Sequence, residues 1–403
     1  MKVERLKVLH LITFLPRLSG AADNTRYSVN LLDPDRYEVH LACGPAELDA
    51  SAVAPHIRVI LIRPLVRAVA PVSDLRAAWT VYRLLRRERY DIVHTHLAKA
   101  GVVGRVAARL AGVPVTVHTP HTISFRASAS PLLNWAFRFA DRACAPLCQK
   151  IITVSRLNAT TYIDARIGRA EQYVTIYSGV ETGKYSAPVD RATCREELGI
   201  VDGDLLVAWI GRLNRQKDPV TFVRAARLIR DRYPRARFVL VGDDPLGESL
   251  EPEVRAAIEG LHLGAAIQLL GYRTDINRIL AAADLVMHTS LYEGLARSVV
   301  EAMLAGVPLV ATAVDGIPEA VVSGERGGLL VPPGDPMALA EAATQLIESP
   351  DLAARLAAAG QSWARERFDV RDMVSALDGL YQKLWQDHLL ESHELDSEPQ
   401  IPC

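Results

Sequence analysis

The sequence is poor in the features that mark several other protein classes. Cysteine is scarce, with five residues in 403, and their odd number and scattered positions argue against a disulfide framework. No uninterrupted apolar run approaches the ~18 residues of a membrane-spanning helix. The first residues are not followed by a long apolar segment with a small-residue cleavage site. We therefore expect no signal peptide and a cytoplasmic protein.

An excess of charge of one sign is also absent. The chain has 46 basic and 47 acidic residues, which leaves a formal net charge of −1. Nucleic-acid-binding domains are usually strongly basic, so we expect no nucleic-acid partner. The fingerprints G-x-G-x-x-G and G-x-x-x-x-G-K-[ST] are missing as well, which argues against common dinucleotide and P-loop sites.

What is present is an alternation of strand-like and helix-like segments that occurs twice. Runs rich in Val and Ile with little polar alternation are typical of strands buried in a parallel sheet. Helical patterns between them, such as residues 99–111 and 219–232, imply right-handed βαβ units. The predicted strands cover 6–14, 37–43, 57–62, 91–95, 114–119, 150–155 and 173–177, and then 205–210, 236–241, 267–270, 285–289, 308–312 and 328–331.

The two series predict an α/β protein with two Rossmann-like, doubly wound parallel-sheet domains facing a central cleft. We place the first domain at residues 1–185 and the second at 186–368, joined through a stretch rich in turn formers. A C-terminal helix at 369–390 is expected to pack back on the first domain. The acidic stretch 391–403 lacks periodicity and is expected to be disordered.

The most informative segment runs from His288 to Glu301. A strand is expected to end at about Thr289, and a helix to begin near residues 296–298, where free N–H groups suit a diphosphate. Glu293 lies in the loop and Glu301 about one turn into the helix. Carboxylates accept paired hydroxyl groups, so one acid is a candidate for a donor sugar and the other for a ribose. The alternative is that both acids are ordinary, favoured near a helix start by its dipole.

A second strand-to-helix turn spans Ile210 to Asp218. Arg212 and Lys217 flank this turn, where a guanidinium and an ammonium can be directed at one phosphate group. Ligands of open α/β sheets bind at this carboxyl edge. The alternative is a solvated basic loop, and Arg215 is expected to face water.

Histidines gather after two other strands. His121 follows the predicted strand 114–119 and is a candidate to bind a sugar hydroxyl or to stabilise charge near a reacting centre. With His118, His94 and His96 it would also suit a metal ion. No carboxylate or cysteine clearly converges on these histidines, so we expect no metal.

Two shorter signals lie near the N-terminus. Gly20 follows the first strand in a small-residue turn that would let the backbone approach a phosphate. Asp33-Pro-Asp35 has the Asp-x-Asp spacing of metal-dependent sugar transferases. It lies between a helix-like segment and a strand, and Asp and Pro favour turns, so we interpret it as a turn.

Taken in order, these segments resemble family 4 glycosyltransferases with the GT-B fold, in the branch that builds capsular and other envelope polysaccharides. Glu293-Gly-Leu-x4-Val-Glu301 resembles the family's Glu-x7-Glu motif. Gly211-Arg-Leu-x3-Lys217 resembles its phosphate-binding segment. The resemblance covers roughly residues 5–385. The family usually has Gly-Gly in the first loop, where this chain has Ser19-Gly20-Ala21.

The resemblance implies retaining transfer of a sugar from a nucleotide-diphosphate donor to an acceptor hydroxyl, with no metal or other cofactor. It implies that the first domain binds the acceptor and the second the nucleotide sugar. Glu293 would contact the donor sugar and Glu301 the ribose. Arg212 and Lys217 would neutralise the diphosphate, and His121 would lie beside the reacting carbon. The other implied donor-binding positions are Gly20, Gly271, Tyr272, Arg273, Gly294, Leu295, Ala296 and Ser298.

The branch further implies a glycan or lipid-linked acceptor and contact with the inner face of the plasma membrane. Residues 74–89 and 131–142 mix arginines with large apolar side chains, as basic amphipathic helices on anionic membrane do. The alternative is that both helices pack on the sheet with a solvated basic face. For the whole chain, the functional alternatives are a GT-B-fold sugar-nucleotide epimerase or phosphorylase and a non-catalytic nucleotide-sugar-binding protein.

Overall fold

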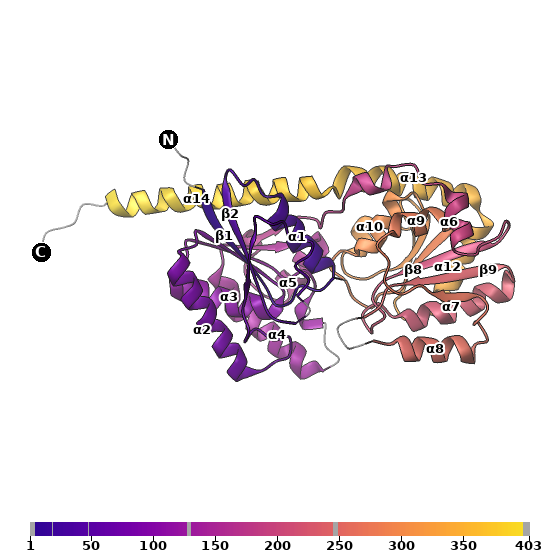
Figure 1. The fold of residues 1–403 in the computed structure, drawn as a ribbon, viewed down its shortest axis with the longest axis horizontal. Coiled ribbons are helices and arrows are strands. Elements are labelled where there is room, and N and C mark those ends of the chain that lie inside the picture. The colour runs from indigo at the N-terminus through magenta and orange to yellow at the C-terminus, as the bar shows by residue number, and fades with distance from the viewer. Residues whose placement is uncertain (1–4, 18, 47, 127–129, 245–248, 398–403) are drawn as a thin grey trace, which may run out of the picture. The chain divides into compact units, whose positions relative to one another are not determined.

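A computed structural model describes residues 5–17, 19–46, 48–126, 130–244 and 249–397 (Figure 1). The chain forms two compact units. Unit 1 consists of Met1–Val154, Ala159–Ile176 and Arg371–Cys403, and unit 2 of Ser155–Asn158 and Tyr177–Val370. Each is built on a wholly parallel sheet with helices packed against it, so the predicted doubly wound α/β class is confirmed.

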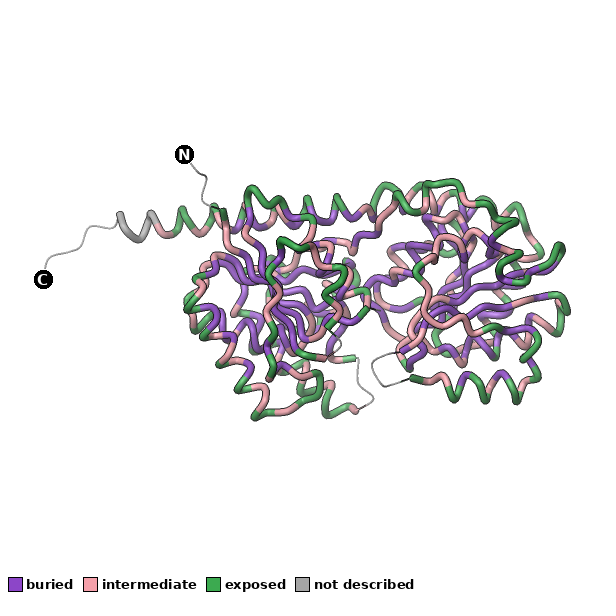
Figure 2. Tube along the Cα trace, in the orientation of Figure 1, coloured by how far each residue is buried: buried purple, intermediate pink, exposed green. Residues whose placement is uncertain are grey.

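Unit 1 contains a seven-stranded sheet in the order β3-β2-β1-β4-β5-β6-β7. Every residue of β4 and β5 is buried, as expected for central strands covered on both faces. Figure 2 shows buried segments in the interior of this unit. The strands are β1 (Leu6–Ile12), β2 (Tyr37–Cys43), β3 (Arg58–Leu61), β4 (Ile92–His96), β5 (Val115–Thr119), β6 (Lys150–Thr153) and β7 (Tyr173–Thr175). The helices are α1 (Gly20–Leu31), α2 (Pro71–Glu88), α3 (Ala98–Ala111), α4 (Pro131–Cys144) and most of α5 (Arg156–Asp164).

The two faces of this sheet differ because side chains alternate along each strand. Leu9, Leu11 and Val93 form one core cluster with buried side chains of α2 and α3. His10 and His94 occupy the alternate positions and contact Tyr381 of the C-terminal helix α14 (Val370–Ser397). Helix α14 is therefore part of the packing of unit 1.

Unit 2 contains a six-stranded sheet in the order β10-β9-β8-β11-β12-β13, around a core that includes Trp209, Phe222 and Phe238. The strands are β8 (Leu205–Ile210), β9 (Ala236–Val241), β10 (Ile267–Leu269), β11 (Leu285–His288), β12 (Leu309–Thr312) and β13 (Gly328–Val331). The helices are α6 (Arg191–Glu197), α7 (Pro219–Arg232), α8 (Glu251–Gly260), α9 (Ile276–Ala282), α10 (Arg297–Leu304), α11 (Ile317–Ala320), α12 (Pro336–Glu348) and α13 (Pro350–Arg367).

The structure departs from the sequence prediction at segment ends. Residues 177–185, placed in the first domain by the sequence, belong to unit 2, where Val180 N donates to Phe368 O at 2.8 Å. Helix α14 extends to Ser397, which corrects the predicted disorder of residues 391–397. No proline or glycine interrupts those residues, so the helix can continue. Residues 398–403 of that predicted tail lie outside the described part.

Other sequence interpretations hold locally. Asp35 N donates to Asp33 Oδ1 at 2.9 Å, which confirms the turn at Asp33-Pro-Asp35. Cys43, Cys144, Cys148 and Cys194 are buried free thiols. Among the described residues, the helices lack the combination of length and apolar composition that crossing a bilayer requires.

Candidate active site

Glu293 lies in the loop between β11 and α10, buried in unit 2. Its Oε1 accepts a hydrogen bond from Ser290 Oγ at 2.7 Å and contacts the ammonium of Lys217, while His288 Nε2 lies 3.4 Å away. Burial by itself would raise the pKa of Glu293. The charge of Lys217 and the hydrogen bond with His288 outweigh that effect and lower it. Glu293 is therefore an ionised carboxylate that acts only as an acceptor.

The loop between β8 and α7 supplies Lys217, and Thr289 fixes its backbone. Thr289 Oγ1 donates toward the carbonyl groups of Lys217 and Asp218, at 2.7 and 2.9 Å. The indole of Trp209 in turn donates to Thr289 Oγ1 at 2.8 Å. Since β8 and β11 are neighbouring strands, the two loops meet at one sheet edge, where the ammonium of Lys217 contacts Glu293.

Arg212 belongs to the same loop and is linked to the Glu293 segment through Gln216. The Gln216 side chain accepts from Arg212 Nη2 at 2.9 Å and donates to Tyr292 O at 3.1 Å. The guanidinium is thus oriented by a side chain that also holds the residue before Glu293. Arg215 is exposed, as the sequence predicted.

Two residues that the motif reasoning did not single out as site residues shape the backbone around Glu293. Asp315 Oδ2 accepts the backbone N–H of Glu293 at 2.6 Å, from a left-handed conformation with φ of 44°. A Cβ on Gly316 would lie 2.2 Å from Gly294 O. Both contacts depend on the pairing of β11 with β12, which brings the two loops together.

The start of α10 offers backbone donors, as predicted. Its N-cap residue, Ala296, has no side-chain oxygen to satisfy them, and an uncapped helix start suits an anion. Leu295 and Ala296 are buried, and the buried Ser298 Oγ has no hydrogen-bond partner among the described residues. Farther along the helix, Glu301 Oε1 accepts from Arg297 Nε at 3.0 Å. Glu301 therefore forms an ion pair with Arg297 within this helix.

Glycines mark the ends of the adjoining strands. Gly211 N donates to Val241 O at 3.0 Å, and Gly242 N donates to Gly271 O at 2.8 Å. Gly271 has a φ of 61° and Gly242 one of 127°, and a Cβ on Gly242 would lie 2.0 Å from Gly211 O. These contacts place the predicted base-binding segment Gly271–Arg273 at the carboxyl edge, beside the loop of Arg212. Within that segment, Tyr272 is partly buried and Arg273 forms an ion pair with Asp275.

Two predicted site residues belong to unit 1. His121 follows β5 with a φ of 66°, and burial lowers its pKa to about 3. Its Nε2 lies 3.0 Å from His96 Nδ1, whereas its buried Nδ1 has no partner among the described residues. Gly20 is the first residue of α1, and a Cβ there would meet no atom within 4 Å. The segment expected to be a turn is thus a helix start.

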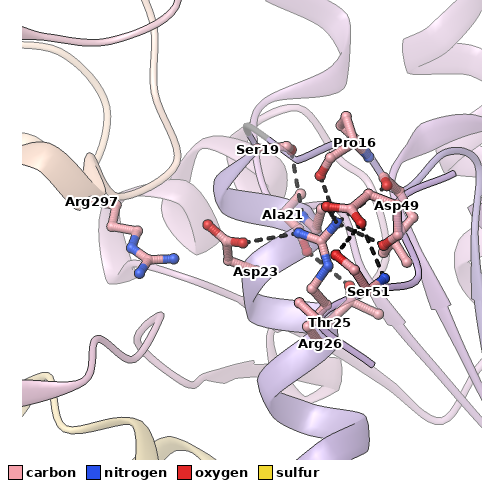
Figure 3. Close-up of polar contacts among 12 residues, drawn as sticks. Pro16, Ser19, Ala21, Asp23, Thr25, Arg26, Asp49, Ser51 and Arg297 are labelled. Carbon is pink, nitrogen blue, oxygen red and sulfur yellow. Dashed lines mark hydrogen bonds and ion pairs between the residues drawn. The ribbon is translucent and has the colours of Figure 1, made fainter. Parts of the chain in front are cut away.

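Arg26 anchors the segment that precedes α1, a role for which the sequence carries no local signal (Figure 3). Its Nη2 donates to the carbonyl groups of Pro16 and Asp49, at 2.9 and 3.1 Å. Its Nη1 donates to Asp23 Oδ1 at 3.0 Å. Ser19 Oγ accepts from Ala22 N at the start of the same helix, at 3.4 Å.

The histidines that lie closest together differ from the four considered as a possible metal site in the sequence. Among the described residues, the group that offers ligand atoms within 4.8 Å of one another is His10, His94 and His96, all buried. His118 instead pairs with Thr95 through Nδ1.

Two doubly wound parallel sheets, with an acid and two cations at the carboxyl edge of the second, match the arrangement expected for a glycosyltransferase of the GT-B fold. The family profile described as "Glycosyltransferase Family 4" matches residues 19–184, and that described as "Glycosyl transferases group 1" matches residues 190–363. The chain belongs to glycosyltransferase family 4, as the motifs predicted.

Relatives and solved structures agree with this assignment. The chain is 28% identical over 330 residues to the UDP-Gal:alpha-D-GlcNAc-diphosphoundecaprenol alpha-1,3-galactosyltransferase of Escherichia coli, covering 81% of this chain and 84% of that protein. It is 30% identical to a D-inositol 3-phosphate glycosyltransferase of Streptomyces scabiei, covering 77% and 71%. The crystal structure of Anabaena HepE with UDP and glucose superposes with a TM-score of 0.78 at 27% identity, covering 94% and 100%.

These similarities confirm the predicted class, fold and enzyme type. The chain is a glycosyltransferase, and the epimerase, phosphorylase and non-catalytic alternatives are not favoured. The roles of the individual site residues stay predictions.

Proposed function

We propose that this enzyme transfers a sugar, with retention of configuration, from a uridine-diphosphate donor to a lipid-linked acceptor in envelope glycan synthesis. The observation that carries the proposal is the buried Lys217–Glu293 pair at the carboxyl edge of unit 2, next to the uncapped start of α10. The E. coli relative is named for a UDP-galactose donor and a diphosphoundecaprenol-linked acceptor, and HepE was crystallised with UDP and glucose.

The cations and the helix start would stabilise the leaving group. Negative charge grows on the diphosphate as its bond to the sugar breaks, and preorganised donors lower the barrier when they meet that charge. An ammonium has three N–H donors, so Lys217 can hold Glu293 and a phosphate oxygen together. With Arg212 and the α10 amides this set needs no metal ion, and we propose a metal-independent enzyme.

The acids would select hydroxyl groups. Glu293 is ionised and acceptor-only, which suits it to a hydroxyl of the donor sugar. Glu301, farther along α10, would hold the ribose, and Gly271, Tyr272 and Arg273 the base. His121 would bind a sugar hydroxyl through its Nδ1. The leaving phosphate would accept the proton of the incoming hydroxyl, so transfer on the same face needs no enzymatic nucleophile.

Donor binding tests the core of this proposal. We expect UDP-galactose, UDP-glucose or UDP to raise the melting temperature with EDTA present, whereas GDP-mannose does not. A ligand at 100 times its dissociation constant adds ~2.7 kcal/mol to stability, which such a screen detects readily. Turnover with a polyprenyl-diphosphate-linked sugar, followed by NMR of the anomeric proton, would reveal retention or inversion. A protein stabilised by no nucleotide sugar would contradict the proposal.

We also propose peripheral contact with anionic membrane through α2 and α4 of unit 1. On α2, Val72, Leu75 and Trp79 are exposed, followed by the exposed Arg83 and Arg86. On α4, Leu132, Trp135 and Phe139 are exposed, with Trp135 stacked on Phe139. Exposed aromatic and aliphatic side chains on a basic helix suit the interface of an anionic bilayer.

The structure corrects part of the sequence argument for these helices. Leu84 and Leu85 belong to the core of unit 1 and take no part in an exposed face. Arg138 and Arg142 donate to the carbonyl group of Ala165. The membrane proposal therefore rests on the apolar residues of both helices and the basic residues of α2. Flotation with vesicles that contain or lack anionic lipid tests it.

A further inference from the structure

A series of hydrogen-bonded side chains, here called the relay, runs through the buried interior of unit 1 and ends at His121. Its members, in order, are Thr119, His94, Tyr381, His10, His96 and His121. From one end, His94 Nε2 lies 2.7 Å from Thr119 Oγ1, and His94 Nδ1 lies 2.6 Å from the Tyr381 hydroxyl. That hydroxyl lies 3.3 Å from His10 Nε2.

The relay continues from Nδ1 of His10. His10 Nδ1 lies 3.0 Å from His96 Nε2, and His96 Nδ1 lies 3.0 Å from His121 Nε2. Both nitrogens of His10, His94 and His96 thus have partners. The remaining nitrogen at the end of the chain, His121 Nδ1, is buried without a partner among the described residues.

All four imidazoles are neutral, because burial lowers the pKa of each below its ordinary value. A neutral imidazole has one N–H donor and one acceptor nitrogen, and a tyrosine hydroxyl has one proton. Every link needs one donor and one acceptor. With the tyrosine proton used in one of these links, they can all be satisfied in only two arrangements, which differ in the direction of every hydrogen bond.

The direction follows from the two distances at Tyr381. Hydrogen bonds donated by a hydroxyl are shorter than those donated by a ring N–H, so we assign the tyrosine proton to the 2.6 Å contact with His94 Nδ1 rather than to the 3.3 Å contact with His10 Nε2. His94 Nε2–H then donates to Thr119 Oγ1, at 2.7 Å. His10 must then donate to the tyrosine oxygen through Nε2–H. It follows that His96 donates to His10, that His121 donates to His96, and that His121 Nδ1 carries a bare lone pair.

We propose that Tyr381, His10 and His96 are positioning residues that fix the tautomer of His121, holding its Nδ1 as an acceptor for a donor-sugar hydroxyl. This rests on the proposed function for the identity of the ligand, although the tautomer itself does not. Through the relay, Tyr381 of the C-terminal helix α14 determines the tautomer of His121, which follows β5. It also explains why histidine occupies three neighbouring positions of β1 and β4.

A metal ion at His10, His94 and His96 would have to displace these hydrogen bonds. Each ligand nitrogen already has a partner, and in the described part of the chain no carboxylate joins the group to offset the charge of a cation. Buried charges need such compensation. Hydrogen bonds between neutral side chains account for the same histidine contacts without a metal ion.

The experiment is NMR of the full chain labelled with ¹⁵N-histidine, in which long-range proton–nitrogen correlations identify each tautomer. Wild-type His121 is expected as the Nε2–H form. In Tyr381→Phe, His10 Nε2–H would be left buried without an acceptor, so the proton should move to Nδ1 and switch His96 and His121 to Nδ1–H. Thr119→Val removes the acceptor of His94 at the other end and should cause the same switch.

Tyr90→Phe is the matched control, because Tyr90 OH lies 2.7 Å from His40 Nδ1 of β2, outside the relay. It should leave His121 unchanged. Release of UDP from UDP-galactose or UDP-glucose should fall about 10- to 100-fold in both relay variants, as for other groups that orient a histidine, with little change in KM.

The outcomes separate the two proposals. An unchanged His121 tautomer in the folded Tyr381→Phe and Thr119→Val proteins would overturn the relay, whatever the donor. So would a bound metal ion in the purified protein whose removal by EDTA moves the histidine signals. A tautomer switch in a protein that binds no nucleotide sugar would support the relay and refute the proposed function instead.

Discussion

Lys217 and Glu293, 76 positions apart in the chain, form an ion pair in the interior of unit 2. Their side chains are only 16% and 6% exposed. Ion pairs at the surface contribute little, whereas removing one partner of a buried pair leaves an uncompensated charge. A change at either residue therefore affects both the proposed chemistry and the fold of the loop.

Replacing Lys217 with alanine should lower turnover far more than donor affinity. An ammonium that meets charge developed in the transition state contributes ~10²- to 10³-fold in rate when preorganised. The measurement is kcat and KM for UDP release, with Arg215→Ala as the control because that exposed cation lies in the same loop. Equal losses in kcat and donor affinity, or no loss at all, would count against the assigned role.

The ion pair should also make stability depend on pH in a defined direction. The folded pKa of Glu293 is lower than its ordinary value of 4.5, so the carboxylate contributes stability that is complete above about that pH. The contribution is lost as the pH falls toward the lower, folded value. In urea unfolding, the stability difference between wild type and Glu293→Gln should shrink from pH 6 to pH 3. A difference that stays constant over that range would show that the charge makes no contribution.

Replacing Gly316 with alanine should displace the loop that carries Glu293. The added Cβ would lie 2.2 Å from Gly294 O and 2.8 Å from Ser155 Oγ, so backbone must move. Overpacking of this kind costs about 1–3 kcal/mol, and the displaced carboxylate should reduce turnover as well. Gly264→Ala is the matched control, since a Cβ there meets nothing within 4 Å. The measurements are the melting temperature and the rate of UDP release of both variants. Equal melting temperatures and equal rates would refute the prediction.

The sequence predicted best those site residues that lie where a strand ends and a helix follows. Strand-to-helix transitions placed Lys217 and Glu293 at carboxyl ends of strands, and ligands gather at that edge in any open α/β sheet. It could not show that Asp315 binds the Glu293 backbone, because that contact needs the pairing of β11 with β12 and a positive φ.

The sequence could not show the histidine relay or the contacts of Arg26 for the same reason, because these contacts join segments that are far apart in the chain. His10 and His96 lie 86 positions apart and meet only because β1 pairs with β4. Tyr381 joins them through the packing of a helix near the other end of the chain, which strand periodicity does not encode. The missed helix start at Gly20 has a different cause. Small residues that suit a turn also suit the first turn of a helix, and the propensities do not separate the two.

Membrane binding through α4 should depend on its exposed aromatic residues. Trp135 and Phe139 are 64% and 62% exposed and stack on one another, so both can enter the interface of a bilayer without unfolding the helix. We expect Trp135→Ser combined with Phe139→Ser to reduce flotation with anionic vesicles at least tenfold, because each large apolar side chain contributes about 1.5–3 kcal/mol on burial. Met337→Ser is the control, since it removes an exposed apolar side chain from α12 of unit 2. Two results together would contradict this prediction: equal flotation of the double variant and the control, and recruitment of the wild-type chain to neutral vesicles as strongly as to anionic ones.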